Sequence, residues 1–567
     1  MDRFSPNREQ LKEILKVARG DLEPDLVIKN VQLLDLINGD MLTTDVAIKG
    51  RWIAGIGEYK GPTLVEATGL TIIPGFIDAH THIESSLMHP FEFEAATLPQ
   101  GTLTTICDPH EIGNVLGEAG IAWFLRCAKH MQQKMLVQIS SCIPSLPGFE
   151  TNGGSLSLEA MNRLKESPYA FGLGEMMNLP AVVAGDDEVL DKLDLFRGRP
   201  LDGHAPTIQG KMLNAYRAAG IQNCHENVTA EEAKEKLRIG MAVMLREGSV
   251  AKNLATLAPI VNSFNSHQCL LCSDDRNPYE IYTEGHINFM VKQLIQKHKV
   301  PPHIAYRLSS YSAAQHYGLK RLGLIAPGYQ ADFLLMSNLE NVDIHQIFVD
   351  GKPLDLQTLN TNIEKHFKAS QPPIHNSINS HNLAPENLQI HLEEAGVYNV
   401  IGVIADEIIT THEKIIYSKG DFLTRKINKI AVLERYQASK QPSLGLVEGF
   451  QLVQGAFAST VAHDSHNIIA VGTEDTDMCL AMNHLKSIGG GFVVANNGKI
   501  TAELALPLAG LMSLESSHSI ADKLTLLKKA IRNLGCELHE PLLQLAFLAL
   551  PVIPSLKITD KGRNNFV

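Results

Sequence analysis

The sequence predicts an α/β protein, namely a (β/α)8 TIM-like barrel with a small β-sandwich built from flanking segments and a C-terminal α+β domain. Eight short apolar runs alternate with helix-like segments over residues 73–322, as repeated β-α units require. Strand-and-turn patterns flank this region on both sides. A third region mixes strands with helices, and 567 residues are too many for one ordinary domain.

Strand-and-turn patterns follow a short amphipathic helix at the N-terminus. We expect the helix over residues 1–20, where Ser5 can cap it and Gly20 can end it. Residues 21–72 alternate apolar and polar side chains between turn signals, which is typical of short antiparallel strands. Residues 323–355 return to this pattern, so the simplest packing joins both flanks in one composite β-sandwich.

The predicted barrel strands are apolar runs of about four to eight residues, separated by helix-like stretches. One run, CLLC, holds Cys269 and Cys272. We interpret it as a buried strand, since no second C-x-x-C follows at the spacing of a zinc site. In chain order the runs lie within TIIPGFIDAH, TLTTICDPH, MLVQISSCIP, AFGLGEMMN, PLDGHAP, IQNCHEN, MAVMLREGS and QCLLCSDD.

Beyond the second flank, the composition changes. Residues 356–390 are polar and are interpreted as a linker. Residues 391–567 combine strand-like runs with helical stretches such as SIADKLTLLKKAIRNLG, so an α+β domain is expected. Within it, FVVANNGKIT predicts a β-hairpin turned at Asn497-Gly498.

Charge and cysteine usage restrict the partners and the compartment. The net charge is −12, which argues against binding a nucleic-acid backbone, because phosphate neutralisation needs clustered lysine and arginine. The eight cysteines lack framework spacing, which favours reduced thiols. The N-terminus has no apolar signal core, and no stretch approaches the ~18 apolar residues of a membrane span. We therefore expect a cytoplasmic protein that binds neither nucleic acid nor membrane. We also expect a homo-oligomer, although none of these patterns specifies the oligomeric state.

The strongest motif is PGFIDAHTHIESS, which places His80 and His82 directly after an apolar run. Residues two apart in a strand point to the same face, and the carboxyl ends of barrel strands open into the active-site mouth. Two imidazoles there can bind one divalent metal. The alternative is a pair of core histidines with satisfied hydrogen bonds, but the preceding P-G-F-I-D-A favours the metal site.

Four further candidate ligands follow at the ends of later runs. Singly, a buried carboxylate is often an ion-pair partner, and a strand-end histidine is often a capping group. Together, at successive strand ends, they predict one metal site, and a carboxylate at the fourth strand could bridge two divalent ions. The four candidates are Glu175, His204, His225 and Asp274.

A metal-bound water that attacks a substrate must lose a proton, so the site also needs a carboxylate that can move one. Asp274 is our choice for both metal ligand and proton shuttle, while Asp275 could bind substrate or fix neighbouring loops. Glu84, two residues after His82, is a second catalytic candidate, or else a charge at a helix start.

Three strand-end groups are candidates for substrate binding. Asp108 and His110, in CDPHE, could contact substrate or support the metal shell, against the alternative of a structural turn. Arg246, in MLREGS, could bind substrate or form a plain ion pair.

A polar cluster in the third region, VAHDSHN, holds His463 and His466 between apolar runs. We expect it to cover the barrel mouth and to contact substrate, because a metal-activated water that attacks a small substrate needs bulk water excluded. The alternatives are another metal site, a polar strand end, or an interface for oligomerisation.

These stretches resemble the adenine deaminase family of the amidohydrolase superfamily. The resemblance is carried by PGFIDAHTHIESS, CDPHEIGNV, GLGEMMN, DGHAP, KLRIGMAVMLREGS and CSDDR, and by VAHDSHNIIAVG and GGGFVVANNGKI. It implies metal ligands on the first, fourth, fifth, sixth and eighth strands. Many superfamily members bridge with a carboxylated lysine, where this chain offers Glu175. It also implies hydrolysis of adenine to hypoxanthine and ammonia with two divalent ions, manganese or iron rather than zinc.

Two other functions are weighed against this one. Another cyclic amidohydrolase, such as a hydantoinase-like or imidazolone-type ring hydrolase, would share the barrel but would usually lack the third region. A non-catalytic scaffold would have lost its metal ligands, yet all candidates are present. Within the preferred function, we expect adenine rather than adenosine as substrate, since no basic phosphate or nucleotide site is evident.

Overall fold

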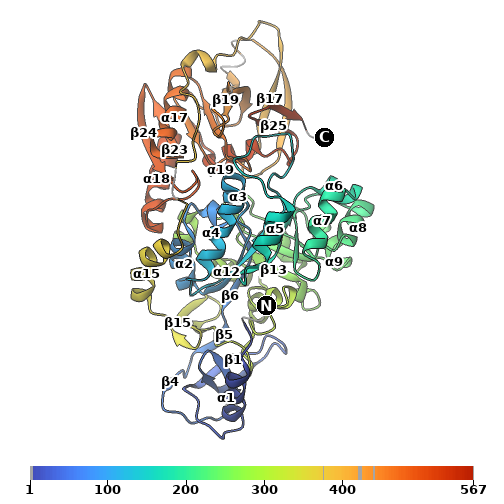
Figure 1. The fold of residues 1–567 in the computed structure, drawn as a ribbon, viewed down its shortest axis with the longest axis vertical. Helices are drawn as coiled ribbons and strands as arrows, with labels where there is room; N and C mark the ends of the chain where they lie inside the picture. Colours follow the sequence, from blue (N-terminus) through green and yellow to red (C-terminus); the bar gives the residue numbers. More distant parts are fainter. Residues whose placement is uncertain (1–3, 374–375, 419, 421–423, 439–440, 566–567) are drawn as a thin grey trace.

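The computed structural model describes residues 4–373, 376–418, 420, 424–438 and 441–565. Three parts succeed one another along the long axis of the molecule (Figure 1). The N-terminal sheet lies at one end, the parallel strands with their helices lie in the middle, and the C-terminal sheet lies at the other end. In the part of the chain that the structure describes, no helix is long and apolar enough to cross a membrane.

The N-terminal helix α1 (Arg8–Ala18) is shorter than expected and has a different cap. Asn7 accepts from the backbone N–H of Gln10, and the Gln10 side chain accepts from that of Asn7. This reciprocal capping box satisfies two N–H groups at the helix start, so the cap is Asn7 and not Ser5. Ile14 and Val17 pack with Trp52 of the first sheet.

Strands from both flanking segments join one connected sheet in the order β16-β15-β14-β5-β1-β2-β3, with β4 beside β1. The two flanks meet where β5 and β14 pair antiparallel, with Ile72 opposite Leu335. The strands are β1 (Leu26–Leu34), β2 (Met41–Lys49), β3 (Trp52–Ile56), β4 (Leu64–Glu66), β5 (Thr71–Pro74), β14 (Phe333–Asn338), β15 (Asp343–Val349) and β16 (Lys352–Pro353).

Eight parallel strands form the middle part, one within each predicted run. They make a five-stranded sheet, β10-β9-β8-β7-β6, and a three-stranded sheet, β11-β12-β13. At one seam Asp274 N donates to His80 O at 3.0 Å, and at the other Gln222 N donates to Leu201 O at 3.1 Å. The strands are β6 (Phe76–Thr81), β7 (Thr102–Cys107), β8 (Lys134–Ile139), β9 (Ala170–Met176), β10 (Leu201–Gly203), β11 (Asn223–Cys224), β12 (Ala242–Arg246) and β13 (Cys269–Cys272).

Helices cover the outside of these strands, which explains why β6, β7, β8 and β13 are buried at every position. The run CLLC is therefore a buried strand as expected, and its cysteines are free. The helices are α2 (Pro90–Thr97), α3 (His110–Leu116), α4 (Glu118–Ala128), α5 (Leu158–Lys165), α6 (Leu179–Ala184), α7 (Asp187–Leu195), α8 (Gly210–Ala218), α9 (Ala230–Arg238), α10 (Leu254–Leu257), α11 (Pro278–Thr283), α12 (Ile287–Gln296), α13 (Pro302–Leu308) and α14 (Tyr311–His316).

The expected linker is in part a helix, α15 (Leu356–Ala369). Asp355 caps it, and its end is fixed to the middle part by a hydrogen bond of 2.9 Å from Trp123 Nε1 to Ser370 Oγ. The interpretation of residues 356–390 as a linker was wrong for this half, because the polar composition belongs to the exposed face of a packed helix.

The C-terminal region contains an eight-stranded sheet in the order β18-β17-β20-β19-β22-β21-β23-β24. The hairpin turned at Asn497-Gly498 is confirmed, since β23 pairs antiparallel with β24. The strands are β17 (Val397–Val403), β18 (Thr410–Ile416), β19 (Asn428–Leu433), β20 (Ser443–Glu448), β21 (Ala456–Ser459), β22 (Ile468–Gly472), β23 (Gly491–Asn496), β24 (Lys499–Ala505), β25 (Leu556–Thr559) and β26 (Gly562–Asn565). The helices are α17 (Asp475–Ile488), α18 (Ser517–Asn533) and α19 (Pro541–Ala546).

The middle part and the C-terminal region share a continuous apolar core. One cluster of buried side chains includes Ile112 and Phe124 from the helices and Val432 and Phe457 from the C-terminal sheet. A core that crosses between the two parts holds the C-terminal region against the carboxyl ends of the parallel strands.

Candidate metal centre and active site

The H-x-H pair lies at the carboxyl end of β6. His80 and His82 are buried, and their Nε2 atoms are 3.1 Å apart. The other ring nitrogen of His82, Nδ1, lies 2.9 Å from the carbonyl oxygen of Asp108, which fixes the ring. The two imidazoles thus present Nε2 to one point, and His82 has the oriented second nitrogen that is typical of a metal-ligating histidine.

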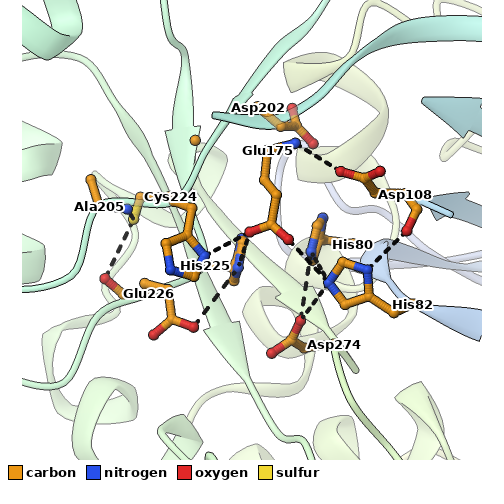
Figure 2. A network of polar contacts seen from close by, with 12 residues as sticks. His80, His82, Asp108, Glu175, Asp202, Ala205, Cys224, His225, Glu226 and Asp274 are labelled. Atoms are coloured by element: carbon orange, nitrogen blue, oxygen red, sulfur yellow. Dashed lines mark hydrogen bonds and ion pairs between the residues drawn. The ribbon is translucent and has the colours of Figure 1, made fainter. Parts of the chain in front are cut away.

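Glu175, at the end of β9, lies between two groups of histidines (Figure 2). Its Oε1 is 3.3 Å from His82 Nε2, while its Oε2 is 2.6 Å from His204 Nδ1 and 3.2 Å from His225 Nε2. Burial opposes ionisation, but His204 and His225 outweigh it and hold the pKa of Glu175 well below its usual range. One ionised carboxylate therefore faces both groups, one oxygen to each.

Asp274 completes the group from the end of β13. Its Oδ1 is 3.3 Å from His82 Nε2 and 3.6 Å from His80 Nε2. The residue has a left-handed backbone, with φ of 51°, and its N–H donates to the His80 carbonyl. Aspartate tolerates this conformation better than most residues, and here the hydrogen bond to β6 holds it in place.

These side chains fit a divalent metal. Burial, together with the nearby His225 and His82, lowers the pKa of His80 well below its usual value, so its imidazole is neutral, as metal binding requires. Three buried ring nitrogens, Nδ1 of His80, Nε2 of His204 and Nδ1 of His225, have no hydrogen-bond partner among the described residues. Within the described residues, several sets of side chains have ligand atoms within 4.8 Å of one another, among them His80, His82 and Glu175; Glu175, His204 and His225; and His80, His225 and Asp274.

A cavity beside this cluster is lined from both parts of the molecule. The parallel-strand side supplies His82, Glu175, Asp274 and their neighbours. The C-terminal region supplies Ile408, His463, Asp464, Phe547 and Leu550. The C-terminal region therefore covers the mouth of the strands.

The two C-terminal histidines, both between β21 and β22, have different positions. His463 lines the cavity, and its ring stacks on Phe547 with centroids 4.6 Å apart. His466 is fully buried and lies behind Glu111, outside the cavity lining, so a substrate contact is not supported for it. Burial lowers the pKa of His466 to about 4, whereas at His463 the Glu111 carboxylate outweighs burial and raises the pKa to about 9.

Comparison with known proteins covers nearly the whole chain. The pattern of the amidohydrolase family matches residues 71–354, and that of the adenine deaminase C-terminal domain matches residues 407–566. An adenine deaminase of Bdellovibrio bacteriovorus is 53% identical over 97% of this chain and 94% of its own. The chain belongs to the adenine deaminase family. Relatives of the same name from Edwardsiella ictaluri and Shewanella halifaxensis are 51% and 50% identical, each over 98% of this chain and 95% of their own.

Glu111 is a cavity residue that sequence reasoning missed in this member of the adenine deaminase family. It lies at the start of α3, and its Oε1 is 2.8 Å from His463 Nδ1 and 3.2 Å from His110 Nε2, while its Oε2 accepts from His466. Its position next to His110 at a strand end was a usable signal. A lone glutamate in the first turn of a helix is, however, common for dipole reasons alone.

Two sequence candidates lie behind the cavity wall. Asp108 accepts from the backbone N–H of Glu175 at 2.9 Å and from the hydroxyl of Ser140. Glu84 accepts from the N–H of Ile112 at 3.1 Å, and burial together with Glu111 raises its pKa to about 7. Among the described residues neither belongs to the cavity lining, so they support the site and direct substrate or acid–base roles are not supported for them.

The other three candidates, His110, Arg246 and Asp275, line the cavity. His110 Nδ1 is 3.2 Å from Glu175 Oε1, which connects the metal-ligand cluster to Glu111. Arg246 forms a bidentate ion pair with Glu226, a second residue that sequence reasoning missed. Glu226 directly follows His225, but a single carboxylate there carries no distinctive spacing.

Proposed function

We propose that this protein hydrolyses adenine to hypoxanthine and ammonia. The observation that carries the proposal is a buried histidine–carboxylate cluster beside a cavity that the C-terminal region covers. This arrangement occurs in a chain at least 50% identical, over nearly its full length, to proteins named adenine deaminase.

The same proposal includes a binuclear centre in which Glu175 bridges two divalent ions. It is supported by the two oxygens of Glu175, which face His82 on one side and His204 and His225 on the other. His80 and Asp274 complete the ligand set. Imidazole and carboxylate donors suit manganese, iron and zinc alike, so the preference for manganese or iron rests on the family resemblance.

Divalent ions held there would supply a water that is nucleophilic near neutral pH. The Asp274 carboxylate would accept a proton from this water as its oxygen adds to C6 of the purine, and would deliver that proton to the leaving amine. The protonated ring of His463, paired with the ionised Glu111 carboxylate, would donate a proton to a ring nitrogen and would recover one from the hydroxyl group on C6. Adenine and water are thereby converted to hypoxanthine and ammonia as the C6–N bond breaks.

The proposal extends to the architecture and the setting of the enzyme. We propose one closed (β/α)8 barrel, supported by the backbone hydrogen bonds at both seams between the two parallel sheets. A cytoplasmic location is supported by the cysteines, all eight of which are free and buried. The homo-oligomer stays a prediction, which light scattering after size-exclusion chromatography would measure.

Ammonia release tests the proposed activity. Manganese-loaded protein is incubated with a panel of free purines, pyrimidines and nucleosides, and ammonia is followed enzymatically. We expect release from adenine and little from adenosine or AMP. Comparable turnover of adenosine would contradict selectivity for the free base. Opening of a hydantoin-type ring, with no ammonia from any purine, would contradict the proposed function.

A further inference from the structure

Arg246 and Glu226 are buried beside Asp274, with exposed fractions of only 2% and 3%. Arg246 ends β12, and Glu226 follows β11. Because Arg246 also lines the cavity, contact with the substrate is the obvious role for it. Whether that role is possible depends on how many of its hydrogen-bond donors are free.

A guanidinium group has five N–H donors in a rigid planar fork. In Arg246, Nε and Nη2 donate to Asn253 Oδ1 at 3.3 and 3.0 Å. Nη2 also donates to Glu226 Oε2 at 2.9 Å, and Nη1 donates to Glu226 Oε1. Nη1 makes a further bond of 2.9 Å to Asp274 Oδ2. These five contacts match the five donors, so none is left to read a purine.

The contact with Asp274 has a specific geometry. Oδ2 accepts from Arg246, while Oδ1 faces His82 and His80. The Asp274 backbone is fixed independently, since its N–H and C=O both pair with β6. Because the backbone and Oδ2 of Asp274 are both held, its Oδ1 can point only toward His82 and His80.

We propose that Arg246, itself held by Glu226, is a positioning residue that aims the Asp274 carboxylate at the metal and the attacking water, and that it does not contact the substrate. Partners in the outer shell of a metal site act in this way, and losing one lowers metal affinity or activity by about 10–100-fold. A lysine cannot replace this arginine, because an ammonium lacks the planar fork that spans Glu226 and Asp274.

The test compares Arg246→Lys with Arg276→Lys. Arg276 is an equally buried arginine that follows the next strand, β13, but it donates to the carbonyls of Gly285 and Glu247 and to Glu284. Mn²⁺ affinity is measured by competition with a fluorescent chelator, and adenine kinetics are measured in saturating Mn²⁺. For Arg246→Lys we expect Mn²⁺ affinity or kcat to fall about tenfold or more, with KM changed less than threefold. Arg276→Lys should change neither quantity more than threefold.

Two outcomes would overturn the proposal. Unchanged Mn²⁺ affinity and kcat in Arg246→Lys would show that Asp274 needs no partner. A tenfold rise in KM at unchanged kcat would instead assign Arg246 to substrate binding. Although the kinetic readout rests on the proposed function, the Mn²⁺ readout does not, so inactivity of the wild type toward adenine would leave the affinity comparison valid.

Folding is controlled with a second variant. A substitution that removed the positive charge of Arg246 would leave the buried Glu226 carboxylate without its cation and would destabilise the protein. Glu226→Gln keeps Arg246 and Asp274 but weakens the support of the guanidinium. Its thermal midpoint should lie close to that of the wild type, and its Mn²⁺ affinity or kcat should fall between those of the wild type and Arg246→Lys. Wild-type values in a folded Glu226→Gln protein would remove Glu226 from the proposal.

Discussion

The two sides of the cavity are built in different ways. On the parallel-strand side, functional groups such as Glu175 and Asp274 lie at the end of a strand or directly after it, and the strands themselves are buried. On the C-terminal side, His463 lies on a loop between antiparallel strands, and Phe547 and Leu550 follow a short helix. Strand ends of a packed sheet hold side chains to the accuracy that a metal requires, whereas loops and helix ends suit a cover.

The two sides also differ in the types of side chain that they contribute to the cavity wall. The candidate metal ligands, which are histidines and carboxylates, come from the parallel-strand side. Toward the C-terminal side the cavity wall merges with an apolar cluster that crosses between the parts, including Met177, Val250, Ile408, Phe547 and Leu550. We therefore predict that substitutions on the parallel-strand side abolish the proposed hydrolysis, and that substitutions on the C-terminal side reduce its rate.

Glu175→Gln is expected to have the largest effect. The amide keeps the size of the side chain but loses the charge that faces both histidine groups. We expect less than two metals per chain by elemental analysis and a fall in kcat/KM of about a thousandfold or more, about 4 kcal/mol in the barrier. Two bound metals with full activity would contradict the bridge. Glu94→Gln, which alters a buried glutamate that accepts from Gln133 outside the cavity lining, is the matched control and should retain metal and activity.

His463→Ala and His466→Ala test the cover, each in a separate protein. Both remove a partner of the Glu111 carboxylate without touching the strand-end ligands. We expect a rate loss of about tenfold or more, about 1.4 kcal/mol in the barrier, with metal content and fold retained. His484→Ala, which removes the exposed pair between His484 of α17 and Glu503 of β24, should leave the rate unchanged. Wild-type rates in both the His463→Ala and the His466→Ala proteins would show that the C-terminal region has only a structural role.

Phe547→Leu is expected to have a smaller effect, on binding. The substitution keeps an apolar wall but removes the aromatic face that stacks on His463. Aromatic pairs contribute about 0.5–1.5 kcal/mol beyond area burial, so KM for adenine should rise about two- to tenfold with kcat less affected. Phe333→Leu breaks the stacked pair with Phe348 in the N-terminal sheet and should leave KM unchanged. A KM shift of equal size in both variants would point to general destabilisation.

The last prediction concerns stability rather than catalysis and comes from Lys557. This buried amine donates to the carbonyls of Ile408 and Phe547 at 2.7 and 2.9 Å, so it holds two residues of the cover. Burial lowers its pKa to about 7, while an unfolded lysine titrates near ~10.4. Between these values the unfolded chain binds the extra proton, so stability gains up to about 1.4 kcal/mol per pH unit as pH rises.

Lys557→Met should lose this dependence. Urea denaturation of both proteins between about pH 7.5 and 9.5 measures it, because other groups contribute equally to both. The difference in unfolding free energy between wild type and variant should shift in favour of the wild type as pH increases. Parallel pH curves would mean that Lys557 is charged in the folded protein.

Sequence patterns anticipated the strand positions well. The eight runs coincide with β6 to β13, because a fully buried parallel strand leaves a short, continuous apolar signal. Composition was a poorer guide outside the strands. A polar stretch was interpreted as a linker where α15 packs, and the N-cap at Asn7 was missed because several residues nearby could serve equally well.

The sequence by itself determined which side chains end the strands, since a candidate ligand such as His80 is tied to its strand by local spacing. Only the tertiary structure decided which of these side chains meet the cavity. Asp108 and Arg246 both end strands, but long-range partners occupy Asp108 behind the wall and saturate every donor of Arg246. His463 and His466 are three residues apart, yet only the first reaches the cavity. Whether a polar side chain keeps a free donor or acceptor after folding depends on partners that are distant in the sequence. A local sequence pattern does not record those partners.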